Sequence, residues 1–106
     1  MTICRLWRGW TTPGNADAYE RVVRGEVIPA IEARNIPGFR HIDLMRRLAG
    51  DEVEFVTLMW FDSLAAIKAF AGDDYEESHV PAAARAVLAR FDDRAVHFEV
   101  LDRRAQ

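Results

Sequence analysis

Two neighbouring runs in the middle of the chain constrain its fold more than any other feature. The runs FRHIDLMRRL (39–48) and VEFVTLMWF (53–61) are rich in β-branched and aromatic side chains, and the short segment AGDE joins them. Two such runs separated by a few residues that include Gly are typical of a β-hairpin. The sequence therefore predicts two adjacent antiparallel strands, around which the other elements must be arranged.

The segment before this hairpin predicts a strand followed by a helix. Residues 2–10, TICRLWRGW, contain many β-formers and end at the turn sequence TTPGN. Over residues 15–34, apolar side chains recur at steps of three and four, as on one face of a helix, and Asn15 is a suitable N-cap. Pro29 is unfavourable inside this helix, so we expect a kink or a weak final turn near Ile28.

The segment after the hairpin predicts two shorter helices and a last strand. Ser63 is placed to cap a helix over 64–71, which has apolar side chains on one face. A second helix is expected over 81–91, because its first residue is a proline whose missing N–H costs nothing there. RAVHFEVLD, at 94–102, reads as a strand.

The order of these elements is strand–helix–strand twice over, within a chain of 106 residues. This order favours an α+β fold, a ferredoxin-like split βαβ with a four-stranded antiparallel sheet and its helices on one face. The length fits a single domain over 1–106.

Alternation along the predicted strands divides their residues into two sets. The first set is almost wholly apolar, and we assign it to the face under the helices: Cys4, Leu6, Ile42, Leu44, Val56, Leu58, Trp60, Val96, Phe98 and Val100. The second set mixes charged groups with aromatic and methionine side chains: Arg5, Trp7, Phe39, His41, Asp43, Met45, Phe55, Thr57, Met59, Phe61, His97, Glu99 and Leu101.

This second set is too aromatic for a face in water and too charged for a monomer core. A face packed against a second copy of the chain satisfies both demands, so we expect a homodimer joined sheet to sheet. The expected interface residues are Arg5, Trp7, His41, Asp43, His97 and Glu99. A monomer whose sheet is half exposed to water is the alternative.

Composition narrows the functional classes. The net charge is −3 and no basic stripe stands out, which argues against a nucleic-acid partner. Cys4 is the only cysteine, so an internal disulfide or a Cys-based zinc site is excluded, and no spacing of His, Asp or Glu predicts another metal site. No apolar run is long enough to span a membrane. We expect a soluble, cytoplasmic protein without a membrane partner.

Three stretches resemble a known family. TLMWFDSLAAIKAFAG, TTPGNADAYERVV and IPGFRHIDLMRR are similar to the third strand and short helix, the first helix, and the second strand of the antibiotic biosynthesis monooxygenase family. The resemblance covers most of the chain. It implies a dimeric α+β barrel, in agreement with the strand faces.

The resemblance also implies two activities. One is oxidation of a small aromatic, polyketide-like substrate by O2 without a cofactor. The other is haem degradation, because YEESH looks like the histidine-bearing segment of the haem-degrading members. The first strand lacks the Asn that both activities lead one to expect, and Phe70 stands where the haem-degrading members place a Trp. A binding or stress-response protein with the same fold and no activity is a third possibility. We favour the cofactor-independent oxygenase.

The candidate site follows from the same comparison. The candidate catalytic residues are His79, Tyr75, Trp60 and Arg85, and the candidate substrate-binding residues are Phe70, Phe91 and Leu58. Three of them have a structural alternative: His79 as a solvated residue before a helix, Trp60 as a core aromatic, and Tyr75 as a loop side chain packed on the surface.

Overall fold

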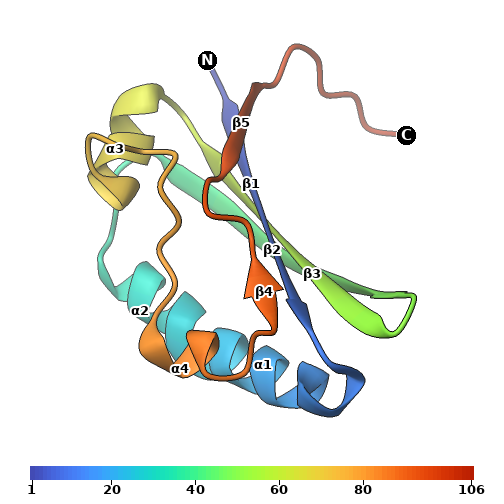
Figure 1. The fold of residues 1–106 in the computed structure, drawn as a ribbon. Helices are drawn as coiled ribbons and strands as arrows, with labels where there is room; N and C mark the ends of the chain where they lie inside the picture. The colour runs from blue at the N-terminus through green and yellow to red at the C-terminus, as the bar shows by residue number, and fades with distance from the viewer.

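The computed structural model describes residues 1–106, which form one antiparallel sheet with helices packed on one of its faces (Figure 1). The strands are β1 (Ile3–Thr11), β2 (Phe39–Ala49), β3 (Glu52–Phe61), β4 (Arg90–Phe91) and β5 (Val96–Glu99). Their order is β2-β3-β1-β4, and β5 also pairs with β1. This α+β, ferredoxin-like arrangement confirms the predicted fold class, except that the last strand is divided between β4 and β5.

The predicted hairpin is present as β2 and β3, paired from Phe39–Phe61 to Ala49–Glu52. Gly50, at φ +67°, provides the left-handed turn residue that an L side chain rarely adopts. The register shifts between Phe39 and His41, which marks a β-bulge. The bulge brings Phe39 to the same face as Ile42, because an extra residue changes the alternation of side chains.

The assignment of the sheet faces is wrong for β1, β3 and β5. Their residues under the helices are Ile3, Arg5, Trp7, Val53, Phe55, Thr57, Met59, Phe61 and His97. The outer face, turned away from the helices, carries Cys4, Leu6, Val56, Leu58, Trp60, Val96 and Phe98, with His41, Asp43 and Met45 of β2 beside them. Both faces are rich in large apolar side chains, so alternation alone did not identify the buried one.

Four of the expected interface residues therefore lie on the helix side of the sheet. Arg5, Trp7 and His97 make contacts there, and Glu99 shares their parity through its pairing with Ile3. His41 and Asp43 are on the outer face, as predicted.

The first helical region begins with a 3-10 turn over Pro13–Asn15 and continues as α1 (Ala16–Val22), a π-helical turn over Val23–Val27, and α2 (Ile28–Ala33). Pro29 has no N–H to donate to the carbonyl four residues earlier, and the helix widens into the π-helical turn just before it. This interruption corresponds to the kink predicted near Ile28. The N-cap prediction is wrong, because the side chain of Asn15 makes no capping hydrogen bond.

The short helix α3 spans Leu64–Ala71, as predicted, and the backbone N–H of Ala66 donates to Ser63 Oγ at 3.2 Å. The helix expected over 81–91 is wrong beyond its first turn, since α4 covers only Ala82–Arg85. Residues 90 and 91 pair instead with β1, so tertiary pairing prevails over helix propensity. No helix in the chain has both the length and the apolar character needed to cross a membrane.

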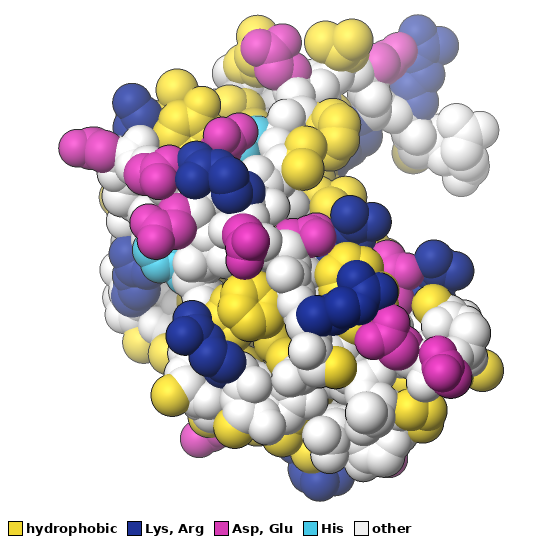
Figure 2. All heavy atoms as spheres, viewed as in Figure 1, with side chains coloured by type: hydrophobic (Ala, Val, Ile, Leu, Met, Phe, Trp, Pro, Cys, Tyr) yellow, Lys and Arg dark blue, Asp and Glu magenta, His cyan; other side chains and the backbone are white.

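Charged side chains of both signs are interspersed over the side of the molecule shown in Figure 2. Many are paired, as in Arg94–Asp74 at 2.6 Å and Arg8–Asp92 at 3.0 Å. These exposed pairs contribute little stability individually. On this side of the molecule, no patch of a single sign marks a docking surface for a polyanion or a polycation.

Candidate functional site

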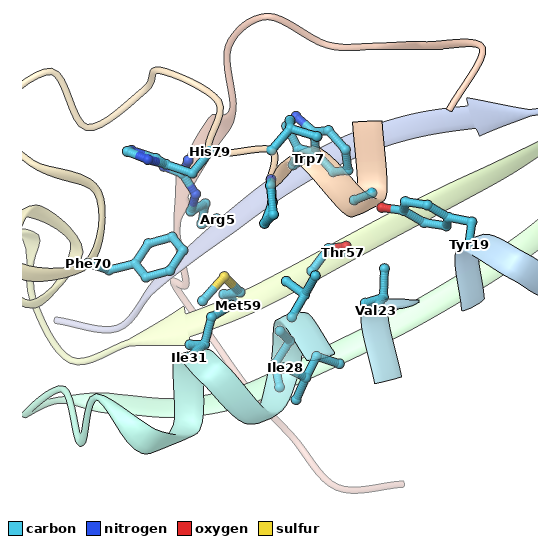
Figure 3. A pocket seen from close by; sticks show the side chains of 15 residues that line it. Arg5, Trp7, Tyr19, Val23, Ile28, Ile31, Thr57, Met59, Phe70 and His79 are labelled. Atoms are coloured by element: carbon cyan, nitrogen blue, oxygen red, sulfur yellow. The ribbon is translucent and has the colours of Figure 1, made fainter. Parts of the chain in front are cut away.

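A cavity of about 70 Å³ lies between the sheet and the helices (Figure 3). Most of its lining is apolar: Arg5, Trp7, Tyr19, Val23, Val27, Ile28, Ile31, Ile42, Thr57, Met59, Phe70, His79, Val80, Pro81 and Ala84. Because about 10–15 Å³ of such space holds one water molecule, the cavity has room for a few waters or part of one aromatic ring. A larger ligand requires movement of the lining side chains.

The floor of the cavity is built from paired positions on β1 and β3. Arg5 lies opposite Met59 and Trp7 lies opposite Thr57, so all four side chains point to the helix side. Figure 3 shows Arg5, Phe70 and His79 at one end of the cavity and Tyr19 at the other. The cation and the histidine thus share one end of the cavity, and the hydroxyl of Tyr19 is at the other.

The indole of Trp7 ties the floor to the chain above it. Its Nε1–H is 2.9 Å from both Ser78 Oγ and the Asp92 carbonyl oxygen, and Ser78 Oγ donates to the same carbonyl. A Cβ on Gly9 would lie 3.0 Å from the Trp7 ring and 2.9 Å from Leu88 Cδ2, so this glycine allows a close approach. Trp7 is therefore a fixed wall of the cavity.

Arg5 is a buried cation without a carboxylate partner. Its side chain is 4% exposed, and its guanidinium donates to the backbone carbonyls of Tyr75 and Glu77, the latter at 3.1 Å. The guanidinium carbon also lies 5.5 Å from the centre of the Phe70 ring. Burial lowers the pKa of Arg5 to about 10, so the group stays charged at neutral pH.

His97 is the third partner of Arg5. Its Nε2 lies 3.1 Å from a terminal nitrogen of the guanidinium. Since a guanidinium can only donate, Nε2 accepts, and the neutral ring carries its proton on Nδ1. Burial and then the charge of Arg5 lower the pKa of His97, which favours this neutral ring. Nδ1 is buried without a hydrogen-bond partner.

His79 and Phe70 form the rim of the cavity. Their rings are 6.0 Å apart between centres, and Nε2 of His79 lies 2.8 Å from the Ala71 carbonyl oxygen. That oxygen can only accept, so Nε2 carries a proton, and Nδ1 is the acceptor when the ring is neutral. A second groove outside the rim is lined by both rings together with Glu26 and Arg34. The pair therefore lines both the cavity and the neighbouring groove.

The structure brings only His79 and Phe70 of the predicted site residues to the cavity lining. The carbonyl of Tyr75 accepts a hydrogen bond from Arg5, and its ring is 5.2 Å from that of His97. Arg85 lies over Phe91, with the guanidinium carbon 5.6 Å from the ring centre, and Phe91 is 6.0 Å from Trp7. None of these three lines the cavity.

The expectation that Trp60 and Leu58 face the helices is wrong. Both lie on the outer face, where Trp60 pairs with Cys4 and has its ring 6.3 Å from that of His41. Sequence reasoning missed Arg5 and Trp7 as cavity residues because it placed their parity at a dimer interface. Arg5 and Trp7 are two residues apart on one strand, so the sequence did indicate that their side chains lie on the same face of the sheet.

A porphyrin does not fit the cavity in this conformation. The cavity, at about 70 Å³, is smaller than one macrocycle, and the rings of Phe70 and His79 are part of its lining. His79 also directs Nε2 to a backbone carbonyl, which leaves only Nδ1 as a possible ligand atom. No cluster of three or more His, Cys, Asp or Glu side chains is arranged to hold a metal ion.

The arrangement defines an α+β protein with an apolar cavity between its sheet and helices, and comparisons place it in a family. The family model for antibiotic biosynthesis monooxygenase matches residues 3–80. The chain therefore belongs to the antibiotic biosynthesis monooxygenase family, as its sequence predicted. A search of curated proteins finds no match.

Solved structures share the fold at low sequence identity. A Bacillus cereus protein assigned to the same family is 13% identical, with a TM-score of 0.70 and coverage of 100% of this chain and 97% of that one. SnoaB from Streptomyces nogalater, described as a cofactor-independent oxygenase, is 20% identical, with a TM-score of 0.60 and coverage of 96% and 95%. A MhuD variant that binds two manganese protoporphyrin IX molecules per active site is 20% identical, with a TM-score of 0.65 and complete coverage of both chains.

Proposed function

We propose that this protein is a monooxygenase that oxidises a small aromatic substrate with O2 and without a bound cofactor. The observation that carries the proposal is the cavity between sheet and helices, which combines apolar and aromatic walls with a buried cation and a histidine at its rim. Membership of the family and the likeness to SnoaB support this type of reaction. Phe70, which stands where the haem-degrading members place a Trp, favours it over haem degradation.

The chemistry requires a proton acceptor and a dry, positively charged surrounding. An activated methylene group of an anthrone-type substrate loses a proton, and the resulting enolate gives electrons to O2 as a C–O bond forms. Protonation yields a hydroperoxide, and loss of water leaves a carbonyl, so that one methylene group and one O2 give one carbonyl group and one water. Nδ1 of His79 is the candidate base, and Arg5 is the candidate stabiliser of the enolate oxygen.

Oxygen consumption tests this proposal. With anthrone as substrate, we expect one O2 consumed for each carbonyl product, and a loss of roughly 100-fold in rate for His79→Ala, the lower range for removal of a general base. Arg21→Ala, which changes an exposed residue of α1, is the control and should keep the wild-type rate. Absence of oxygen uptake across a panel of anthrones and phenols, with binding retained, would instead identify a non-catalytic binding protein.

We further propose that a second copy of the chain covers the outer face. Phe98 and Val96 of β5 are 54% and 48% exposed there, and Met45 of β2, across the sheet, is 46% exposed. These side chains continue the apolar surface of Leu58 and Trp60 across neighbouring strands. An exposed apolar patch rimmed by polar groups such as His41 and Asp43 is typical of a protein interface.

Light scattering tests the dimer. We expect twice the mass of one chain at micromolar concentration and a shift to the single-chain mass for Val96→Glu, which places a charge in the apolar patch. Leu48→Glu is the matched control, because Leu48 is 70% exposed at the hairpin end of β2. A wild-type protein that is monomeric at this concentration would refute the dimer.

A further inference from the structure

We propose that the cavity selects an aromatic ligand bearing an oxyanion, which pairs with the guanidinium of Arg5. This inference rests on the proposed function for its site and adds the charge of the ligand. It is carried by the position of Arg5, which lies in the cavity lining with a side chain that is 4% exposed. No other lining residue carries a permanent charge.

The hydrogen bonds of Arg5 leave part of its donor capacity unused. A guanidinium has five N–H bonds, and the protein accepts from the two terminal nitrogens only: Tyr75 O and His97 Nε2 from one, and Glu77 O from the other. The Nε–H and one further N–H have no acceptor in the chain. A planar pair of oxygens, or one ionised oxygen, is the group that matches unused guanidinium donors.

The charge of Arg5 is also uncompensated. No Asp or Glu forms an ion pair with it, although ten such pairs occur elsewhere in the chain. Its three acceptors are two carbonyls and a neutral imidazole, which are dipoles and not charges. A buried cation without a counter-ion is unfavourable, so an anionic ligand gains from both Coulomb attraction and hydrogen bonding in a water-poor space.

The side chains around Arg5 indicate what kind of group carries the oxyanion. The ring of Phe70 lies against the guanidinium, and Ile31 and Met59 line the same end of the cavity. An aromatic ring attached to the oxyanion would rest on these side chains, while a small inorganic anion would not fill the apolar space. The chemistry is therefore that of an aromatic carboxylate or an ionised aromatic hydroxyl, such as a phenolate or the enolate of the proposed reaction.

The test compares probes that share a shape and differ in charge. Calorimetric titration at neutral pH should show benzoate binding about tenfold more tightly than benzamide, as expected when a charge-assisted hydrogen bond replaces a neutral one. Acetate, which has the charge without the ring, should bind more weakly than benzoate. A second arm uses 4-nitrophenol, whose absorbance reports ionisation: binding should favour the phenolate and lower its apparent pKa. A preference confined to benzoate would identify a carboxylate ligand, and a pKa shift of 4-nitrophenol would identify an ionised hydroxyl.

Variants connect the preference to Arg5. Arg5→Met should abolish the preference of benzoate over benzamide, and Arg5→Lys should retain part of it, because Lys keeps the charge without the planar donors. Arg21→Met is the matched control and should bind as the wild type does. If Arg5→Met does not fold, the binding of benzoate, benzamide and 4-nitrophenol to the wild-type protein still tests the proposal. The proposal would be overturned if benzoate showed no preference over benzamide and 4-nitrophenol showed no pKa shift.

These measurements need no turnover and can be made without O2. Preference for oxyanions without oxygen consumption would support this inference and refute the proposed function. A protein that consumes oxygen with anthrone, but neither distinguishes benzoate from benzamide nor shifts the pKa of 4-nitrophenol, would support the proposed function and refute this inference.

Discussion

Tyr19 gives the stability of this protein a dependence on alkaline pH. Its side chain is 2% exposed on α1, and its ring packs edge-on against Phe55 with 4.6 Å between ring centres. Burial raises the pKa of Tyr19 from 10.0 to about 12, because the phenolate would have to form away from water. The phenol is therefore favoured in the folded protein over a wider pH range than in the unfolded chain.

The sign and size of the effect follow from linkage. Between pH 10 and 12 the unfolded chain releases the Tyr19 proton while the folded protein keeps it, so the free energy of unfolding falls as the pH rises. The loss from this one group is about 1.4 kcal/mol at pH 11 and approaches about 2.7 kcal/mol above pH 12. Stability is fully retained below pH 10.

Urea unfolding at pH 9, 10 and 11 measures the loss. Arg5, whose lowered pKa falls in the same range, contributes to the total, so the informative quantity is the difference between wild type and Tyr19→Phe. That difference should change by about 1.4 kcal/mol between pH 9 and pH 11. In Tyr75→Phe, Tyr19 is the only tyrosine left, and its tyrosinate absorbance should titrate near pH 12. A midpoint near 10, or a pH-independent difference, would refute the burial argument.

Three further substitutions test the packing around the site. Phe55→Ala should lower the free energy of unfolding by about 3–5 kcal/mol, because Phe55 is fully buried, while Leu48→Ala on the exposed end of β2 should change it by less than about 0.5 kcal/mol; urea unfolding measures both. Ser63→Ala should cost about 1 kcal/mol in the same assay through loss of the cap of α3, and Ser63→Thr should restore most of it. Gly9→Ala should cost about 1–3 kcal/mol and change the tryptophan emission, since its methyl group would contact Trp7 and Leu88; an unchanged stability would show that the two side chains move aside freely.

Local signals in the sequence were sufficient for much of the fold. The turn between β2 and β3, the cap at Ser63 and the interruption near Pro29 each depend on a few adjacent residues, and each is present. The helix expected over 81–91 failed because Arg90 and Phe91 pair with β1, a partner far away in the chain. Such pairing is set by tertiary structure and leaves no periodic signal in the segment itself.

The candidate site was only partly predictable for a related reason. His79 and Phe70 lie in a stretch that resembles the family, and both reach the cavity rim. Trp60 and Leu58 do not, because their place depends on which face of β3 the helices cover. Charge was the criterion used to choose that face, and it misled because Arg5 and His97 satisfy each other by a hydrogen bond beneath the helices.

The corrected faces change what Arg5 indicates about function. On an outer face it would have been one of several charges available for pairing across a dimer. Under the helices it is a buried cation that contacts two carbonyls, a neutral histidine and an aromatic ring, and it has no counter-ion in the chain. The outer face is left apolar, with half-exposed Phe98 and Val96, and so has a stronger need for cover by a second copy than the predicted mixed face had. The proposed dimer therefore rests on burial of apolar side chains and no longer on charge pairs. Arg5, which is not at that interface, is placed to pair with a charged ligand in the cavity.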